Sequence, residues 1–150
     1  MAVSTAYINQ ILPKDAARVV IPGHVIQVQS NYTQVGSVSG NNVTLITVNI
    51  TPTYSNSKIL IHASNGAERN GGGVGDYIFV NVVRNTTVLG RTFNAMGYQV
   101  ATNARQYGAL TYLDSPNTTS TITYKLVTET SSSVSWIHYD TAITVMEIAQ

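Results

Sequence analysis

The chain has 150 residues, the usual size of one domain, and 43% of them are hydrophobic, which is enough for a packed core. Only 10% are charged, against about 25% in an average protein, and the formal net charge is +1. The electrostatic field of such a surface is too weak to attract nucleic acid or an anionic lipid surface, so we expect no nucleic-acid partner.

The same composition limits the chemistry and the location of the chain. It contains no cysteine, which excludes disulfides and thiolate metal sites. The first twenty residues mix Lys14, Asp15 and Arg18 with short apolar pieces, which is not the pattern of a signal peptide. No apolar run approaches the roughly 18 residues that span a bilayer, so we expect no membrane insertion.

Residues 1–22 differ from the rest of the chain. They show no clean alternation of apolar and polar side chains, and Pro13 and Pro22 bracket their only charge cluster. We interpret 1–22 as an extended N-terminal arm and 23–150 as the main domain; an ordinary first strand at 17–21 is the alternative. The arm carries its own apolar set, which we predict attaches it to a partner: Val3, Tyr7, Ile8, Ile11 and Leu12.

Beyond residue 23, apolar and polar residues alternate with a period of two in short segments separated by turn residues. The segment DYIFVNVVR is the most apolar, and we expect it in the centre of a sheet. Residues 70–75 and 93–106 lose the alternation and are interpreted as loops. The predicted strands, of which the third should stop at Asn65 and Gly66, are 24–30, 43–50, 58–63, 76–84, 88–92, 134–138 and 141–149.

The stretch YLDSPNTTSTITYKLV at 112–127 is predicted to be a hairpin with Asp114 and Pro116 as its structural turn residues. The Asp114 carboxylate can accept a hydrogen bond from the backbone two residues on, and Pro116 fixes φ at about −65°. Threonines alternate with other residues beyond the turn, as in a half-buried strand. We expect the strands at 119–129 and 141–148 to lie near neighbouring subunits, which would bury their edges.

Short strands with turn signals between them predict an all-β fold, an antiparallel β-sandwich or jelly roll with an extended N-terminal arm. No segment keeps apolar residues at helical spacing. The large aromatic residues of the strands are expected in the core: Tyr77, Phe79, Tyr112, Tyr124 and Trp136.

The sequence shows no catalytic or metal-binding motif. His24, His62 and His138 lie far apart and none has a metal-ligand spacing, so each is best explained as a structural histidine. The carboxylates are dispersed; folding could bring two together for acid–base chemistry, but nothing in their spacing predicts it. The glycines of GGGVG at 71–75 precede a strand, not the helix of a dinucleotide site. We therefore expect no enzymatic activity, no metal and no cofactor.

Four stretches resemble the β-rich domains of tailed-bacteriophage structural proteins: ITPTYSNSKILI, VNVVRNTTVLG, YLDSPNTTSTITYKLV and TAITVMEIAQ. In that pattern a TP…SKI segment begins one strand and an arginine, here Arg84, follows the central strand. An LDSP turn, here 113–116, precedes a threonine-rich strand, and the chain closes on MEI, here 146–148. The resemblance covers residues 24–150. It implies a virion protein, assembled in the host cytoplasm and usually a homotrimer.

A tail fibre normally carries a long shaft before such a domain, whereas only 22 residues precede it here. We therefore interpret the chain as a homotrimeric capsid decoration (cement) protein on the head, with the major capsid protein or other virion proteins as partners. The alternative is a short tail fibre or adhesin that binds a host-surface receptor or glycan through Tyr98, Arg105 and Tyr107, with Phe93 nearby. An unrelated carbohydrate-binding module or enzyme is the remaining reading.

Overall fold

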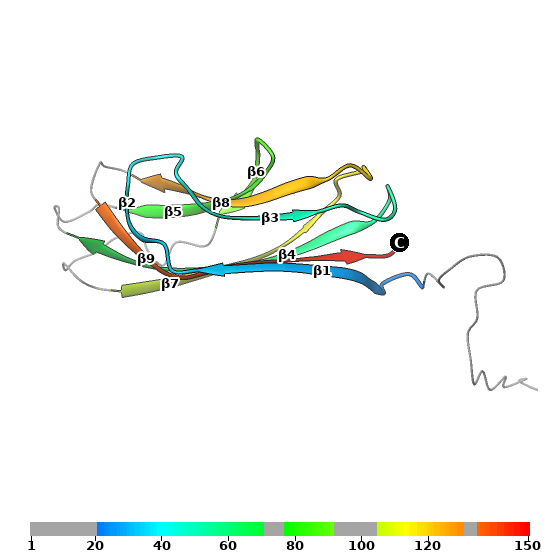
Figure 1. Cartoon of the computed structure of the whole chain (residues 1–150), viewed down its shortest axis with the longest axis horizontal. Coiled ribbons are helices and arrows are strands. Elements are labelled where there is room, and N and C mark those ends of the chain that lie inside the picture. The colour runs from blue at the N-terminus through cyan, green and yellow to red at the C-terminus, as the bar shows by residue number, and fades with distance from the viewer. Residues whose placement is uncertain (1–20, 71–76, 92–104, 131–134) are drawn as a thin grey trace, which may run out of the picture.

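The structure is a computed structural model that describes residues 21–70, 77–91, 105–130 and 135–150. Within these ranges all regular structure is β-strand, in two antiparallel sheets packed face to face (Figure 1), which confirms the all-β sandwich. The strands are β1 (Val25–Thr33), β2 (Gly36–Ser39), β3 (Thr44–Ile50), β4 (Lys58–Asn70), β5 (Ile78–Arg84), β6 (Thr87–Arg91), β7 (Arg105–Asp114), β8 (Ile122–Thr130) and β9 (Ser135–Ile148).

The first sheet has the order β1-β9-β4-β7, with β2 also paired to β9, and the second has the order β3-β8-β5-β6. Figure 1 shows the two layers and places the C-terminus where β1 begins. We call this the terminus end of the sandwich, and the opposite end, where β4 ends and β9 begins, the far end. Strands that follow one another in the chain mostly alternate between the two sheets.

The predicted hairpin at 112–127 is wrong. β7 pairs with β4 in the first sheet, whereas β8 pairs with β3 and β5 in the second. Alternation shows which face of a strand is buried, but it does not show which strand lies beside it. β7 and β8 therefore lie in different layers, and the strand of the second sheet that β7 contacts most is β6.

The expectation that 119–129 and 141–148 form exposed edges is also wrong. β8 lies between β3 and β5, and β9 lies between β1 and β4, so both are inner strands. The prediction of a central position for 76–84 is confirmed, because β5 lies between β8 and β6.

Two strand boundaries differ from the prediction. β4 continues through Asn65 and Gly66, because the Asn65 amide Nδ2 has a buried acceptor 2.7 Å away in Thr141 Oγ1 and the register against β9 shifts at this point. The strands predicted at 134–138 and 141–149 are one strand, β9, in which Asp140 adopts a φ of 47°. The proposed loops at 71–75 and 93–104 lie outside the described residues, and Asn70, Arg105 and Gln106 belong to strands.

The core lies between the sheets and consists mainly of branched aliphatic residues from β3, β4, β5, β8 and β9. Trp136 and Tyr124 are fully buried, as predicted, and each contributes roughly 2–3 kcal/mol by burial. Tyr112 and Phe79 are only half-buried. Tyr77 is 37% exposed, against the prediction, because its ring packs at a tilt of 55° against Phe79 (ring centroids 4.9 Å apart), whose side chain points away from buried Ile78 and Val80.

Candidate interaction surface

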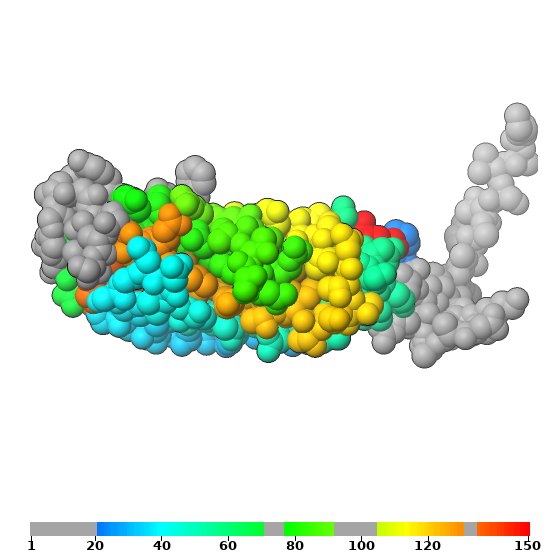
Figure 2. Space-filling view, turned by 90° about the horizontal axis from the view of Figure 1, so that it is seen from above, coloured from blue at the N-terminus to red at the C-terminus, as the bar shows by residue number. Residues whose placement is uncertain are grey.

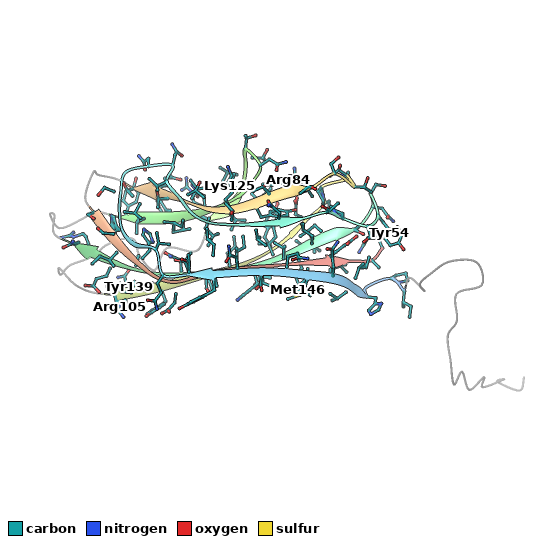
Figure 3. The ribbon with its side chains drawn as sticks, viewed as in Figure 1. Tyr54, Arg84, Arg105, Lys125, Tyr139 and Met146 are labelled. Carbon is teal, nitrogen blue, oxygen red and sulfur yellow. The ribbon has the colours of Figure 1, made fainter. Side chains whose placement is uncertain are left out.

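The outer face of the first sheet carries a row of apolar side chains that runs across all four strands near the terminus end. Cross-strand pairing places Val28 of β1 beside Met146, Met146 beside Leu60, and Leu60 beside Leu113 of β7. Val28 and Leu113 are 51% and 50% exposed, although the residues that flank Leu60 and Met146 are fully buried. Figure 3 shows Met146 on this outer side of the layer. We call these four residues the apolar row.

The next two rows toward the far end contain small or uncharged residues. Ser30, Thr144, His62 and Thr111 form one row, and Tyr32, Ala142, Ser64 and Ala109 form the other. His62 Nδ1 lies 3.1 Å from Thr111 Oγ1. The middle of the face therefore carries no Asp, Glu, Lys or Arg side chain.

The face ends in a group of tyrosines around Asp140. Tyr32 donates its hydroxyl to Asp140 Oδ1 at 2.8 Å, and Tyr107 donates to Oδ2 at 3.4 Å. Gly66 makes room for this arrangement, because a Cβ at that position would lie 2.6 Å from Tyr107 Cε1. Both rings remain more than half exposed, at 58% for Tyr32 and 54% for Tyr107.

Arg105 and Tyr139 complete this end of the face, and Figure 3 shows them together. The Arg105 Cζ lies 3.8 Å from the centroid of the Tyr139 ring, a cation–π distance. Glu68 Oε2 accepts from Arg105 Nη2 at 3.4 Å and from the Tyr139 hydroxyl at 3.3 Å. Hydrogen bonding to Tyr107, and then to Glu68 and Tyr139, raises the pKa of Arg105, while burial opposes the rise. We call the whole group the aromatic end: Tyr32, Glu68, Arg105, Tyr107, Tyr139 and Asp140.

Two of the residues predicted from the sequence lie at the aromatic end. Arg105 and Tyr107 are two apart on β7 and point to the same face. Tyr98 and the five predicted attachment residues of the arm lie outside the described residues. Tyr32, Tyr139 and Asp140 were not predicted, because they come from β1 and β9 and meet Tyr107 only through the pairing of distant strands. The one signal in the sequence was the break in the alternation of apolar and polar residues at 139–140.

The outer face of the second sheet, seen in Figure 2, is more polar. It presents Thr47, Asn49 and Thr123 together with Lys125 and Glu129. A shallow depression of about 270 Å3 lies on it, slightly below the usual range of ligand pockets, and Lys125 is its one charged lining residue. The lining residues are Asn42, Thr44, Val83, Asn85, Thr86, Val88, Lys125 and Val127.

Two buried carboxylates hold the terminus end together. Asp114 of the first sheet accepts from Arg84 Nη1 at 2.8 and 3.0 Å and from the Tyr124 hydroxyl at 2.7 Å, and both donors come from the second sheet. Burial, and then the hydrogen bond to Asp114, raises the pKa of Tyr124. The assignment of Asp114 and Pro116 as turn residues stays a prediction, but the Asp114 carboxylate also links the two layers.

Glu147 is fully buried and lies in the same inner row as Asp114, with Ile59 between them. Its carboxylate accepts five hydrogen bonds of 2.7–3.3 Å from the Gln27 side-chain amide, the Thr53 and Tyr54 backbone amides, and the Thr53 and Ser57 hydroxyls. Burial raises the pKa of Glu147, but these hydrogen bonds outweigh it and the pKa lies below its usual value. Folding thus brings the two acids near one another, each engaged by its own donors.

The described residues contain no group of three His, Asp or Glu side chains that could hold a metal ion. His138 is fully buried on β9, with Nδ1 3.2 Å from Asn65 Oδ1, and burial lowers its pKa to about 4. Within the same ranges, no helix is long and apolar enough to cross a membrane.

By sequence, no protein-family model and no curated protein matches the chain. By structure, it is similar to the VP2 subviral particle of infectious bursal disease virus, with a TM-score of 0.54, 14% identity and coverage of 93% of this chain and 37% of that one. The T13 particle of the same virus gives a TM-score of 0.51 at 12% identity, covering 93% and 35%. The Eiger TNF of S. frugiperda gives 0.56 at 8% identity, covering 87% and 95%.

At these identities the similarity is one of fold, the jelly-roll β-sandwich. The chain spans 35–37% of the length of the two viral chains. The resemblance to tailed-bacteriophage proteins stays a prediction.

Proposed function

We propose that this chain is a non-enzymatic structural protein of a virion, a homotrimeric decoration protein on the head of a tailed bacteriophage. The observation that carries the proposal is the outer face of the first sheet, a broad and weakly charged surface that suits contact with protein. Exposed apolar patches of this kind mark protein–protein contacts. The jelly-roll fold, which the chain has in common with proteins of viral particles, supports the same conclusion.

The N-terminal arm is proposed to attach the protein to the major capsid protein or to other virion proteins. The Gly23 amide donates to the Ala149 carbonyl at 2.8 Å, and the Ala149 amide donates to the His24 carbonyl at 2.9 Å. These bonds fix the start of the β domain, from Gly23 on, at the terminus end of the sandwich. Five apolar side chains in the arm could contribute several kcal/mol on docking at roughly 25 cal/mol per Å2, reduced by the cost of ordering the segment.

The test is to rebind the protein to virions stripped of it. The full chain with Ile8→Asp and Ile11→Asp should remain an oligomer yet lose binding, because the two carboxylates cannot be buried on a partner. The control with Asn9→Asp and Gln10→Glu adds the same charge to the same segment and should bind as wild type. Unchanged affinity of the first variant would place attachment on the β domain.

The aromatic end favours a second candidate, a short fibre or adhesin that binds a host-surface glycan. Exposed tyrosine rings can stack on a sugar, while Arg105, Glu68 and Asp140 can hydrogen-bond its hydroxyls. In this case wild-type protein should bind host cells, and Tyr107→Ala or Arg105→Ala should abolish that binding. A decoration protein should show no such binding, and neither substitution should reduce its attachment to virions.

A further inference from the structure

We propose that copies of this chain pack against one another through the outer face of the first sheet. The proposal rests on the homotrimer of the proposed function and names the surface that forms it. The contact comprises the apolar row, the two uncharged rows beside it, and the aromatic end.

Exposed apolar side chains are concentrated on this face. Four of the eight large hydrophobic residues that are exposed in the described ranges lie on it: Val28, Tyr32, Tyr107 and Leu113. Val28 and Leu113 are the two ends of the apolar row, and Met146 and Leu60 lie between them. An apolar stripe across a whole sheet is a surface that a partner usually covers.

The face is large enough for a stable contact. Four strands spaced about 4.8 Å apart, over some 11 residues of about 3.4 Å each, span roughly 700 Å2. A standard interface buries about 800 Å2 on each partner. A flat sheet can offer most of this area without any rearrangement.

The charges on this face favour a second copy as the partner. In a trimer the same face of each chain turns toward the three-fold axis, so like charges near the axis come together and the contact must lack a cluster of one sign there. The middle rows meet this condition. At the aromatic end Arg105 is balanced by Glu68, which lies 3.4 Å away, and Asp140 is left as a single negative charge that accepts hydrogen bonds from Tyr32 and Tyr107. The second sheet instead presents Lys125 and the exposed pair of Arg91 with Glu129.

The hydrogen bonds at the aromatic end also favour a protein partner over a sugar. The hydroxyls of Tyr32 and Tyr107 already donate to Asp140, and that of Tyr139 donates to Glu68. These rings can therefore be covered without leaving an unpaired hydroxyl donor. Tyrosine and arginine are enriched in the cores of protein interfaces, where other charged residues are depleted.

The test introduces single charges into the full chain. Val28→Glu and Leu113→Glu each place a carboxylate in the apolar row, and both sites are exposed enough for the subunit to fold, which circular dichroism will verify. Val88→Glu is the matched control, because Val88 is 57% exposed but lies on β6 of the other sheet. Sedimentation velocity at micromolar concentration should give three chains for wild type and the control. The two test variants should sediment as monomers and need about 100-fold more protein to assemble.

A second measurement identifies what covers the face. The chain has no cysteine, so Leu113→Cys and Val88→Cys each introduce a single thiol. We expect a maleimide to react at least tenfold more slowly with the thiol at 113 than with the thiol at 88. If the Ile8→Asp, Ile11→Asp change abolishes that protection without changing the particle mass, the arm covers the face and the proposal is overturned.

Two further outcomes separate this proposal from the function on which it rests. Trimers that persist in Val28→Glu and Leu113→Glu would overturn the contact and leave the homotrimer standing. A wild-type monomer at micromolar concentration would overturn both, although attachment through residues 1–22 would still stand or fall by the virion-binding test.

Discussion

The two ends of the sandwich stabilise their buried polar groups in different ways. At the terminus end, two acids are buried with full sets of donors: five neutral groups for Glu147, and Arg84 with Tyr124 for Asp114. At the far end, His138 is buried beside Asn65, which in turn donates to Thr141. Since Asn65 uses its amide nitrogen on Thr141, its oxygen faces His138 and the imidazole Nδ1 carries the hydrogen.

Burial causes the low pKa of His138, and the tautomer shows which nitrogen is affected. With the hydrogen on Nδ1, protonation must occur at Nε2, which is buried and has no partner in the part of the chain that the structure describes. The surroundings of Glu147 at the terminus end thus favour its charged form, whereas those of His138 toward the far end favour its neutral form. The terminus end is secured by charge-assisted hydrogen bonds, which depend on its carboxylates remaining ionised.

The largest effect is expected for Glu147→Gln at the terminus end. A glutamine keeps the shape but turns an NH2 group toward donors, and it removes the charge that strengthens all five bonds. The free energy of unfolding at pH 7, from urea denaturation, should fall by about 3–5 kcal/mol. The control Gln27→Ala removes one donor and should cost about 1 kcal/mol. A loss for Glu147→Gln no larger than that of the control would mean that the network contributes little.

Asp114→Ala should follow, at about 2–4 kcal/mol, because it leaves the half-buried Arg84 without its carboxylate and Tyr124 without an acceptor. Tyr124→Phe removes only the hydroxyl and should cost about 1 kcal/mol. The melting temperatures of the two variants, compared with wild type, measure these losses of stability. If Asp114→Ala cost no more than about 1 kcal/mol, the value expected for a turn residue alone, the link between the sheets would carry no stability.

The pH dependence of stability should separate the two ends. The pKa of His138 is lowered from 6.5 to about 4, so below pH 6.5 the histidine takes up a proton in the unfolded chain but not in the folded one. The free energy of unfolding therefore has its full value above pH 6.5 and falls by up to about 3 kcal/mol as the pH drops toward 4. Glu147 also has a lowered pKa, so its contribution is present above its unfolded pKa of about 4.3 and is lost at lower pH.

Urea denaturation from pH 7 to pH 3 tests this assignment. His138→Gln should flatten the curve between pH 6.5 and about 4. Glu147→Gln should flatten only the part below about pH 4.3. Identical curves for wild type and His138→Gln would refute the proposed difference between the ends.

The smallest effect is expected for Pro116→Gly, in the segment that leaves Asp114 for the second sheet. Glycine enlarges the conformational freedom of the unfolded chain and should lower the free energy of unfolding by about 1 kcal/mol or less. The variant should still bind virions. A loss comparable to that of Asp114→Ala would mean that the segment itself, not the buried carboxylate, stabilises this end.

The sequence predicted where the strands lie in the chain better than it predicted which strands pair with one another. The apolar run in DYIFVNVVR indicates a buried strand whatever lies beside it, and β5 is an inner strand of its sheet. The hairpin at 112–127 failed because β7 and β8 are adjacent in the chain but belong to different layers. Asp114 shows the physical reason: its donors come from Arg84 and Tyr124, and short-range turn preferences contain no information about such contacts.

The candidate surface was only partly predictable for the same reason. Arg105 and Tyr107 were named from the sequence as part of a loop, and the structure instead places both on β7, two residues apart and on one face. The apolar row and the position of Asp140 depend on the register of β9 against β4, which shifts between Ser64 and Gly66. A register shift of one residue moves every later side chain to the other face, and no local pattern fixed it here. The division at residue 22 stays a prediction.

Electron cryomicroscopy of virions carrying this protein tests the central claim most directly. We predict three-fold densities on the head, each with the terminus end toward the capsid and the outer faces of the first sheets turned toward one another. Density at the tail tip would contradict the decoration function, and isolated single copies on the head would contradict the homotrimer and its contact.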